Sequence, residues 1–531
     1  MKEVIIILKG VNCMFYLNTN VSAIQFQKVI NSEPYVDKSG LIDPLNKLIG
    51  TANCYVCITR PRRFGKTINA HMLGAYYTKG QNNKNMFDSL IISNKPSYEK
   101  HLNLHNVIFI DFSVLPANCS SYESYIEYIQ YKILTDIQQT YGITPYENLS
   151  VSDLLTATGD SFIFILDEWD SVFYRKFMSS TDKNNYLLFL RDLLKDKPYV
   201  ELAYMTGILP IAKYSSGSEL NMFQEYNFMN DHVYENYFGF QENEVKVLCK
   251  KQTKITYEEL VSWYDGYYMS DGSHLFNPRS VNCALRDGVC LNYWTETGPM
   301  NEIADCIEHN IDEVREDVVK MISGIPVEAE LMGYSASEQQ LNTRDEILSA
   351  MVVFGFLSYH DRVLRIPNRE LMEKHQRVLS RNSMGEVKKI VDQSKEMLAA
   401  TLQQNTQKVA SILESVHDRE IPFLKYNDEN SLSCVITLCY LYARNEYYIE
   451  REFATGKGFC DYIFIPKRKG KTGIILELKV GHSPQEALKQ IKDKNYIQKL
   501  DMCKDVLLVG INYSTEKHHE CKIEQVFLQY R

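Results

Sequence analysis

The stretch TRPRRFGKT, residues 59–67, restricts the fold more than any other part of the chain. An apolar, strand-like run, YVCI, leads into a basic turn, and Gly65, Lys66 and Thr67 then open a helix-compatible segment, INAHMLGAYY. Backbone N–H groups at a turn and a helix N-terminus bind anions, a lysine ammonium reaches phosphate oxygens, and a threonine hydroxyl can hold Mg²⁺. The pattern therefore predicts a phosphate-binding loop, although Arg60 stands where the usual G-x-x-x-x-G-K-[ST] pattern has its first glycine.

A second segment, FIFILDEWD (162–170), is an apolar run that ends in acids. Strands buried in a parallel sheet are apolar on both faces, and ligands of open α/β sheets bind at the carboxyl ends of strands. We therefore expect Asp167 to hold Mg²⁺ and Glu168 to polarise an attacking water. The alternative is a core strand followed by a solvated acidic turn. The order of this segment after the glycine–lysine–threonine turn favours the first interpretation.

A third strand-like run, VELAYMTGILPI (200–211), places Thr206 at its carboxyl end. A hydroxyl there suits a sensor of the γ-phosphate, and the alternative is a cap for the following turn. The expected nucleotide site consists of one set of residues, namely Arg60, Arg63, Gly65, Lys66, Thr67, Asp167 and Thr206. Within that set, Thr67 and Asp167 are the expected metal ligands.

Composition limits the class of protein. A chain of 531 residues suggests two to four domains, and a net charge of −9 argues against non-specific coating of nucleic acid. The 13 cysteines are irregularly spaced, and Cys54-x-x-Cys57 lies on a strand without a second pair, which favours buried thiols over zinc. We expect a cytoplasmic protein. No apolar run reaches eighteen residues, and the run VIIIL (4–8) is too short for a leader or a membrane span.

Strand-like and helix-like segments alternate before residue 235, with a strand at 106–113 and helices at 122–140 and 185–196. This alternation predicts a doubly wound α/β domain with a mostly parallel sheet. A helix followed by a hairpin at 345–371 has the outline of a winged helix. The expected parts are an N-terminal extension (1–34), the α/β domain (35–235), a lid of short helices and turns (236–300), a helical and winged-helix-like region (301–400) and a last α/β domain (401–531).

The last domain carries a second group of polar residues. Asp461 lies on the strand FCDYIFIP, and Glu477 and Lys479 lie two residues apart on the strand GIILELKVG, so these two project from one face. Asp461 and Glu477 would hold Mg²⁺, and Lys479 would orient the water or neutralise charge during phosphodiester cleavage. The alternative is a solvent-facing edge strand with an ordinary Glu/Lys pair. The α-β-β-β-α-β order favours a nuclease fold. Three further residues are expected near this site: Glu452, Gln490 and Tyr496.

Collinear motifs make the chain recognisable; they are YVDKSG, TRPRRFGKT, ILDEWD, MTGI, WYDGYY, NYWTETG, GKGFCD, LELKVG and ALKQI. Over nearly its full length the chain resembles AAA-ATPase-like proteins with a C-terminal PD-(D/E)XK nuclease-superfamily domain. That family's loop also carries arginine at the position of Arg60. Two departures are Trp169, where tyrosine is more usual, and Arg279, where an aromatic residue is more usual.

The resemblance implies a P-loop NTPase fold joined to a PD-(D/E)XK fold. The expected activities are ATP hydrolysis with Mg²⁺ and metal-dependent cleavage of nucleic acid, with DNA as the first expectation and Glu168, Asp461, Glu477 and Lys479 as catalytic residues. A homo-oligomer is compatible with the sequence. One alternative is an ATP-gated signalling switch whose last domain only binds nucleic acid or a protein. Another is an ATPase that acts on a protein substrate.

Overall fold

A computed structural model describes residues 14–117, 119–143, 150–211, 219–294, 312–331, 343–379, 386–417, 429–455, 458–468, 470–493, 500, 503–514 and 518–528. The chain forms two compact units. Unit 1 consists of Met1–Pro299, Glu330–Arg362 and Pro367–Glu370, and unit 2 consists of Met300–Ala329, Val363–Ile366 and Leu371–Arg531. Each unit has a sheet and a hydrophobic core of its own.

The main sheet of unit 1 has five parallel strands in the order β2-β3-β4-β1-β5. They are β1 (Tyr55–Thr59), β2 (Asn106–Asp111), β3 (Phe162–Asp167), β4 (Val200–Gly207) and β5 (Gln224–Tyr226). β3 is buried along its whole length, as its continuous apolar run predicts. β4 lies between β1 and β3, so the carboxyl ends of these three strands meet at one edge of the sheet.

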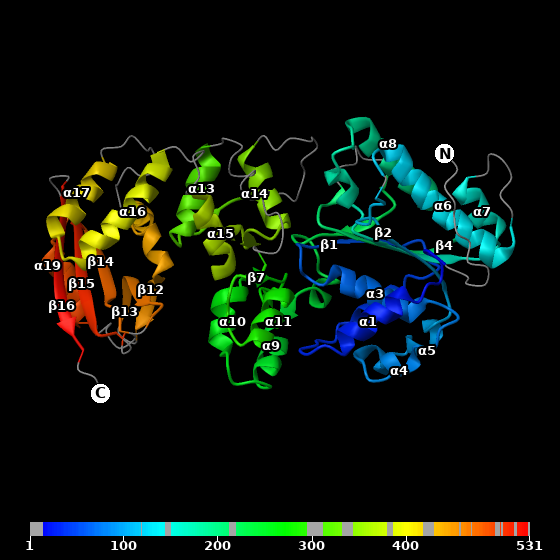
Figure 1. Cartoon of the computed structure of the whole chain (residues 1–531), viewed down its shortest axis with the longest axis horizontal. Helices are drawn as coiled ribbons and strands as arrows, with labels where there is room; N and C mark the ends of the chain where they lie inside the picture. Colours follow the sequence, from blue (N-terminus) through cyan, green and yellow to red (C-terminus); the bar gives the residue numbers. More distant parts are fainter. Residues whose placement is uncertain are drawn as a thin grey trace. The chain divides into compact units, whose positions relative to one another are not determined.

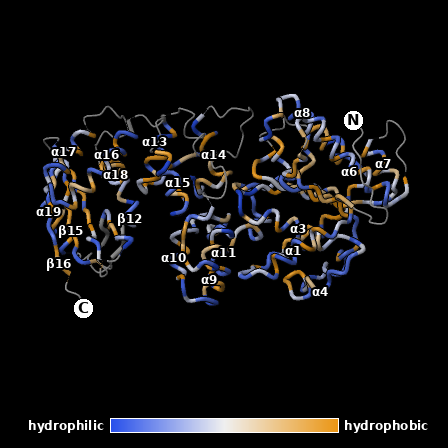
Figure 2. The backbone as a smooth tube through the Cα atoms, viewed as in Figure 1, coloured by the Kyte–Doolittle hydropathy of each residue, from blue (hydrophilic) through white to orange (hydrophobic). Residues whose placement is uncertain are grey.

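Helices cover both faces of this sheet, as a doubly wound fold requires (Figure 1). One face packs against α6 (Tyr122–Tyr141), α7 (Val151–Ala157) and α8 (Ser180–Leu194). The other face packs against α1 (Val21–Ile30), α2 (Ile42–Asn46), α3 (Lys66–Tyr77), α4 (Lys84–Phe87) and α5 (Tyr98–His101). The short 3₁₀ turns are η1 (Ser39–Leu41), η2 (Ile91–Asn94) and η3 (Ser171–Tyr174). The apolar residues concentrate in the strands and on the inner sides of the helices (Figure 2). The α/β fold is therefore confirmed.

Residues 14–34 belong to this fold, which differs from the expected N-terminal extension. Leu17 forms an antiparallel bridge with β2, and the Asp136 carboxylate in α6 accepts three successive backbone N–H groups ending at Leu17, at 2.7–2.9 Å. Phe26 of α1 is 1% exposed in the core between α1 and α3. The sequence could not reveal this packing, because the contacts join residues about 120 positions apart.

The expected lid region is a small group of helices and short strands with its own core. Its elements are η5 (Glu235–Tyr237), β6 (Phe240–Gln241), α9 (Glu242–Cys249), α10 (Tyr257–Tyr264), β7 (Tyr267–Tyr268), β8 (His274–Phe276) and α11 (Pro278–Asp287). The strands pair antiparallel in the order β6-β8-β7. Asn277 caps α11 by accepting the Ser280 N–H at 3.1 Å, and Pro278 occupies the first helical position, where no N–H is needed.

The expected winged-helix region is divided between the two units. Unit 1 contains α14 (Arg344–Val353) and β10 (Ser358–His360), whereas unit 2 contains α13 (Asp312–Ile322) and β9 (Val327–Glu328), which pairs antiparallel with β11 (Val363–Arg365). Helix α15 (Arg369–Leu379) follows. The predicted order of helix, strand, turn and strand is present, but residues 301–400 do not form one domain.

Unit 2 is built on a mixed five-stranded sheet in the order β12-β13-β14-β15-β16. Its strands are β12 (Tyr447–Thr455), β13 (Gly458–Pro466), β14 (Gly473–Val480), β15 (Asp505–Tyr513) and β16 (His519–Phe527). β14 and β15 are parallel, and the other pairs are antiparallel. Helix α19 (Pro484–Asp493) packs on one face. The remaining elements are α16 (Glu386–Leu402), α17 (Thr406–His417), α18 (Glu429–Cys439) and η8 (Leu441–Asn445). The predicted α-β-β-β-α-β order is confirmed from α18 to β15.

The structure also bears on two further expectations, the absence of a membrane-spanning helix and the burial of Cys54 and Cys57. None of the helices described there is both long and apolar enough to cross a bilayer. Cys54 and Cys57 are buried free thiols, and burial raises the pKa of each.

Candidate functional site

The loop between β1 and α3 contains the expected phosphate-binding residues. It ends at Gly65, which precedes α3 with a φ of +93°, a left-handed conformation that is unstrained only for glycine. Lys66 begins α3, is 4% exposed, and donates from Nζ to the carbonyl oxygens of Arg60 and Pro61 at 3.0 and 3.1 Å. The ammonium is thus held over its own loop, next to the N-terminus of α3, where anions are favoured.

Phe64 fixes the position of this loop. Its side chain is 1% exposed, and its ring lies 5.4 Å from Phe228, 5.2 Å from Tyr267 and 6.4 Å from Trp294, measured between ring centroids. Each ring meets Phe64 nearly edge to face, an arrangement favoured by aromatic quadrupoles. Aromatic packing around Phe64 therefore holds the backbone beside Gly65 in place, in a loop that lacks the first glycine of the usual pattern.

The side chain of Arg60 does not point into the loop, which corrects the expectation that it binds nucleotide. Its guanidinium is 2% exposed, pairs with Asp231, and donates to the carbonyl oxygens of Thr59 at 2.7 Å and Tyr226 at 3.1 Å. It also lies over the ring of Phe238 at 5.0 Å. Arg60 thus ties the start of the loop to the end of β5 and to the segment after it, and only its backbone carbonyl faces Lys66.

Asp167 lies at the end of β3 and is fully buried. Its Oδ1 accepts the backbone N–H of Glu168 at 3.1 Å and the Thr206 hydroxyl at 3.4 Å. Burial, together with the charge of Glu168, raises the pKa of Asp167 to about 7, whereas the Thr67 hydroxyl and the charge of Lys66 oppose this shift. The structure therefore brings together the four expected residues Lys66, Thr67, Asp167 and Thr206.

Two acids, Glu168 and Asp170, lie within three residues after Asp167. Glu168 is half-buried and has a φ of +51°, a backbone conformation that is unfavourable for residues other than glycine. Its carboxylate is close enough to Asp167 for its charge to raise the pKa of Asp167. Asp170 accepts the N–H groups of Ile208 at 3.1 Å and Leu209 at 2.9 Å, and burial raises its pKa to about 6. Sequence reasoning missed Asp170, although it belongs to the same acidic run. The structure shows that it anchors the turn after β4.

Two arginines lie near the loop from different elements. Arg63, in the loop, has a φ of +73°, and partial burial followed by the positive charge of Arg279 lowers its pKa, whereas Glu168 opposes the shift. Arg279 lies in the first turn of α11 in the lid. The structure therefore gives Arg279, a departure from the family pattern, a position close to the expected phosphate site.

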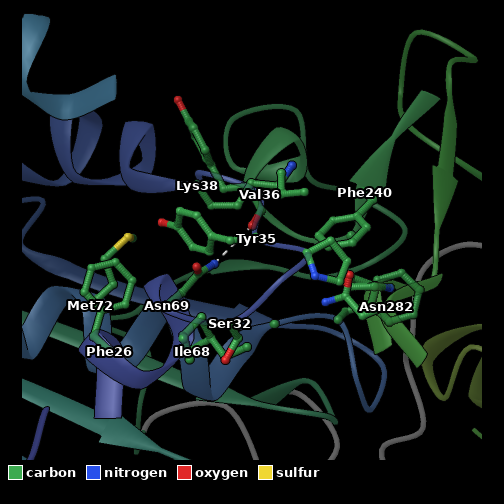
Figure 3. A pocket seen from close by; sticks show the side chains of 17 residues that line it. Phe26, Ser32, Tyr35, Val36, Lys38, Ile68, Asn69, Met72, Phe240 and Asn282 are labelled. Carbon is green, nitrogen blue, oxygen red and sulfur yellow. Dashed lines mark hydrogen bonds between the residues drawn. The ribbon is translucent and has the colours of Figure 1, made fainter. Parts of the chain in front are cut away.

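A cavity of about 260 Å³ begins at Gly65 and lies between α3, the lid and the segment before β1. Figure 3 shows Phe26, Ile68 and Met72 on the core side and Phe240 with Asn282 on the lid side. Its walls are mainly apolar and aromatic, and few polar groups face it, as is usual for sites of organic ligands. Sequence reasoning did not find this cavity, because residues from 26 to 282 surround it.

The second group of polar residues meets on the sheet of unit 2. Asp461 Oδ2 accepts the Leu478 N–H at 2.6 Å, so the carboxylate on β13 is fixed against β14. Lys479 Nζ lies 3.4 Å from Glu477 Oε1, and Gln490 of α19 donates to the same oxygen. Burial and the nearby charge of Asp461 raise the pKa of Glu477 to about 7, and Lys479 opposes this shift. The expected trio and Gln490 are thus adjacent.

Both sites can be compared with the needs of Mg²⁺, which prefers carboxylate oxygens. In the part of the chain that the structure describes, Asp167 Oδ2 and Glu477 Oε2 are buried and have no hydrogen-bond partner. A cation would satisfy such an oxygen, so the residues present fit a divalent metal at each site. No cluster of three or more His, Cys, Asp or Glu side chains suited to a metal occurs among the described residues. Tyr496 and the side chain of Glu452 lie outside them.

Comparison with known proteins matches two segments of the chain to protein families. Residues 21–216 match a family described as "Predicted AAA-ATPase", and residues 427–523 match the PD-(D/E)XK nuclease superfamily. No curated protein matches.

Solved structures match the chain at low identity and with TM-scores below 0.5. A Walker-type ATPase of Pyrococcus abyssi is 14% identical, with a TM-score of 0.30, over 64% of this chain and 94% of that chain. The Aeropyrum pernix ORC2 protein is 12% identical, with a TM-score of 0.31, over 65% and 96% of the two chains. A signal-transduction ATPase of Pyrococcus horikoshii with a tetratricopeptide-repeat sensor is 15% identical, with a TM-score of 0.24, over 78% of this chain and 53% of that chain.

The two matched segments contain the two sites: the first includes the β1–α3 loop and Asp167, and the second includes Asp461 and Glu477. The chain therefore contains a predicted AAA-ATPase segment and a C-terminal PD-(D/E)XK nuclease-superfamily segment, the architecture that the sequence motifs predict.

Proposed function

We propose that unit 1 binds and hydrolyses ATP with Mg²⁺ and that the last domain cleaves phosphodiester bonds in nucleic acid, DNA in the first instance, with a divalent metal. One observation supports this most strongly. A buried carboxylate oxygen without a hydrogen-bond partner among the described residues recurs at both sites, on Asp167 and on Glu477, each near a lysine.

In the nucleotide site, each residue has a role that follows from its position. Lys66 exchanges its two carbonyl partners, Arg60 and Pro61, for phosphate oxygens, which accept charge-assisted hydrogen bonds. Thr67 and Asp167 hold Mg²⁺, which neutralises charge on the transferred phosphoryl group. Thr206 donates to Asp167, so its hydroxyl is placed to respond to the γ-phosphate.

Glu168 is the residue that orients the attacking water. Its carboxylate adjoins Asp167, and the backbone of Glu168 is held by the hydrogen bond from its N–H to Asp167 Oδ1. The base of the nucleotide occupies the cavity that begins at Gly65, because that cavity continues from the phosphate loop. Arg279 is placed to approach the phosphates from the lid.

Binding and hydrolysis can be tested separately on the full chain. Lys66→Ala should weaken ATP binding by about tenfold or more, because charge-assisted contacts to phosphate are lost. Glu168→Gln should bind ATP normally but hydrolyse it about 100-fold or more slowly, since it keeps the shape of the side chain and loses its basicity. Lys79→Ala, just beyond the far end of α3, is the matched control. If Lys66→Ala binds and hydrolyses ATP like the wild type, the assignment is wrong.

In the second site, Asp461 and Glu477 hold the metal and Lys479 stabilises the negative charge of the transition state. Supercoiled plasmid DNA with Mg²⁺ or Mn²⁺ is the probe. Glu477→Gln should abolish nicking, whereas Glu446→Gln, a half-exposed carboxylate before β12, should leave it unchanged. Equal nicking by Glu477→Gln and wild type would remove the nuclease assignment. Mn²⁺ binding without nicking would instead favour a last domain that only binds its partner.

The compartment is also part of the proposal. We place the protein in the cytoplasm, because the sequence has an odd number of irregularly spaced cysteines and the cysteines whose side chains are described are free thiols.

A further inference from the structure

The lid side of the cavity raises the question of which base the site accepts. We infer that Asn282 of α11 recognises the amino-substituted edge of adenine, so that the lid itself selects ATP over GTP. This inference rests on the proposed nucleotide site and adds base specificity to it.

The cavity restricts how a base can lie. Phe26 of α1 and Ile68 and Met72 of α3 form one wall, and Phe240 faces them from the lid (Figure 3). Flat aromatic and apolar walls favour the faces of a purine ring and leave only its edge for hydrogen bonds. Specificity must therefore come from the polar groups at the rim of the cavity.

Three of the polar side chains that line the cavity already have partners. Lys38 Nζ pairs with Glu244 at 2.7 Å, the Asn69 amide donates to the Tyr237 carbonyl at 3.0 Å, and the Ser32 hydroxyl donates to the Lys28 carbonyl at 2.7 Å. These groups are therefore not available without breaking existing bonds.

Asn282 differs from them. Its Oδ1 is shielded from solvent and has no hydrogen-bond donor among the described residues, although its carboxamide lines the cavity. A buried amide oxygen without a partner is unfavourable, and a donor from a ligand would satisfy it. The Tyr35 hydroxyl is also buried without a partner in the same part of the chain. Because a hydroxyl both donates and accepts, Tyr35 does not distinguish bases.

The chemistry of a carboxamide matches adenine. An asparagine side chain can accept from the exocyclic amino group and donate to the adjacent ring nitrogen, which is the bidentate pairing used in adenine recognition. Guanine in the same pose places its O6, an acceptor, against Oδ1, and the buried oxygen stays unpaired. A site built around a hydrogen bond rejects an analogue that lacks the matching group far more strongly than an apolar pocket does.

The position of Asn282 on its helix strengthens the inference. Arg279 and Asn282 are three residues apart on α11, so their side chains lie on neighbouring parts of one helix face. Arg279 is close enough to Arg63 in the phosphate loop to lower its pKa, and Asn282 lines the cavity. A single lid helix thus contributes one residue near the phosphate loop and one residue to the cavity.

The first test requires no variant. Binding of ATP, GTP and purine riboside 5′-triphosphate, which lacks the exocyclic amino group, is measured on the full-length wild type by titration calorimetry without metal. ATP should bind about tenfold or more tighter than either analogue, the range expected for one bidentate base contact. Equal affinities for ATP and the purine riboside triphosphate overturn the inference.

The second test uses Asn282→Asp, with Asn185→Asp on the exposed side of α8 as the charge-matched control. A carboxylate accepts the two N–H donors of the guanine edge but repels the ring nitrogen of adenine, so the ATP-to-GTP affinity ratio should fall about tenfold or more in Asn282→Asp alone. An equal loss for both nucleotides indicates charge repulsion only and overturns the inference. If wild type binds ATP and Lys66→Ala does not, an unchanged ratio refutes base recognition but leaves the proposed function intact. If neither protein binds any nucleotide, both fail.

Discussion

Asp167 is a fully buried acid whose pKa is raised to about 7. In the unfolded chain the same carboxyl loses its proton near pH 4. The folded state is therefore destabilised progressively as pH rises from 4 to 7, and the full penalty is present above pH 7. Replacement by asparagine keeps the size and removes the charge. We therefore expect Asp167→Asn to have a higher free energy of unfolding than wild type at pH 8, by about 2–4 kcal/mol, since each pKa unit corresponds to about 1.4 kcal/mol.

The advantage of Asp167→Asn should shrink as pH falls from 7 towards 4, because the folded carboxyl is already protonated there and the unfolded carboxyl gains its proton as pH approaches 4. Urea unfolding without metal at several pH values measures it. Asp111→Asn, a partly exposed acid at the end of β2, is the control and should show a smaller effect. A less stable Asp167→Asn at pH 8 would show that the carboxylate is already neutralised in the folded chain.

Glu477 has a pKa raised to about 7 for a similar reason, and metal binding must displace its proton. Mn²⁺ affinity at this site should therefore rise between pH 6 and pH 8. The measurement is Mn²⁺ titration of full-length Asp167→Asn, in which the first site has lost its carboxylate. The double variant that also carries Glu477→Gln supplies the baseline. A flat pH profile would contradict the assignment of Glu477 as a ligand.

At the scale of the elements, Arg60 stands in the β1–α3 loop at the position of the first glycine of the usual phosphate-loop pattern. Its buried guanidinium pairs with Asp231 and bonds two backbone carbonyls. Arg60→Gly restores the common loop pattern, yet we expect it to destabilise unit 1 by about 3–5 kcal/mol, because it leaves the buried Asp231 without its partner. Combining it with Asp231→Asn should recover part of that loss.

Thermal unfolding of Arg60→Gly, Asp231→Asn and the double variant forms a double-mutant cycle for this pair. Arg62→Gly, at the next arginine in the loop, controls for the greater flexibility that glycine brings. Additive effects in the cycle would mean that the ion pair contributes nothing beyond its separate residues.

Local patterns predicted strands β1 to β4 and β12 to β14 and several of the helices around the two sheets. The run FIFILD became β3, and the spacing of apolar residues after residue 121 became α6, because continuous burial and helical periodicity leave direct traces in sequence. The order of elements in the last domain was predictable for the same reason. Lys66, Asp167, Asp461 and Glu477 could be proposed as site residues because they follow strands in recognisable motifs.

Other features depend on contacts between segments that are far apart in the sequence, so no local sequence pattern predicted them. The burial of Arg60 depends on Asp231, and the docking of residues 14–17 depends on Asp136. The cavity combines α1, α3 and α11, so no single motif marks Asn282. The hairpin after α14 was predicted correctly, but its division between two units reflects packing that periodicity does not record.

At the scale of the whole molecule, the proposed coupling between ATP and cleavage can be tested directly. We expect ATP to change the rate of plasmid nicking by full-length wild type at least several-fold. Glu168→Gln, which holds ATP without turnover, should show the bound-state rate continuously. Lys66→Ala should keep the rate seen without nucleotide whether or not ATP is added. Identical nicking in all three proteins with and without ATP would mean that the two sites work independently.

The assignment of segments to the units has a consequence for how the protein can be divided. The chain enters unit 2 at Met300 and later returns to unit 1 for Glu330–Arg362 and Pro367–Glu370. The polypeptide therefore passes between the two units several times. No single protease nick releases one intact half, and a fragment that stops at residue 299 lacks α14 and β10. By contrast, the segment matched to the nuclease superfamily, residues 427–523, lies within the uninterrupted stretch Leu371–Arg531, so a cut before residue 371 leaves that segment in one piece.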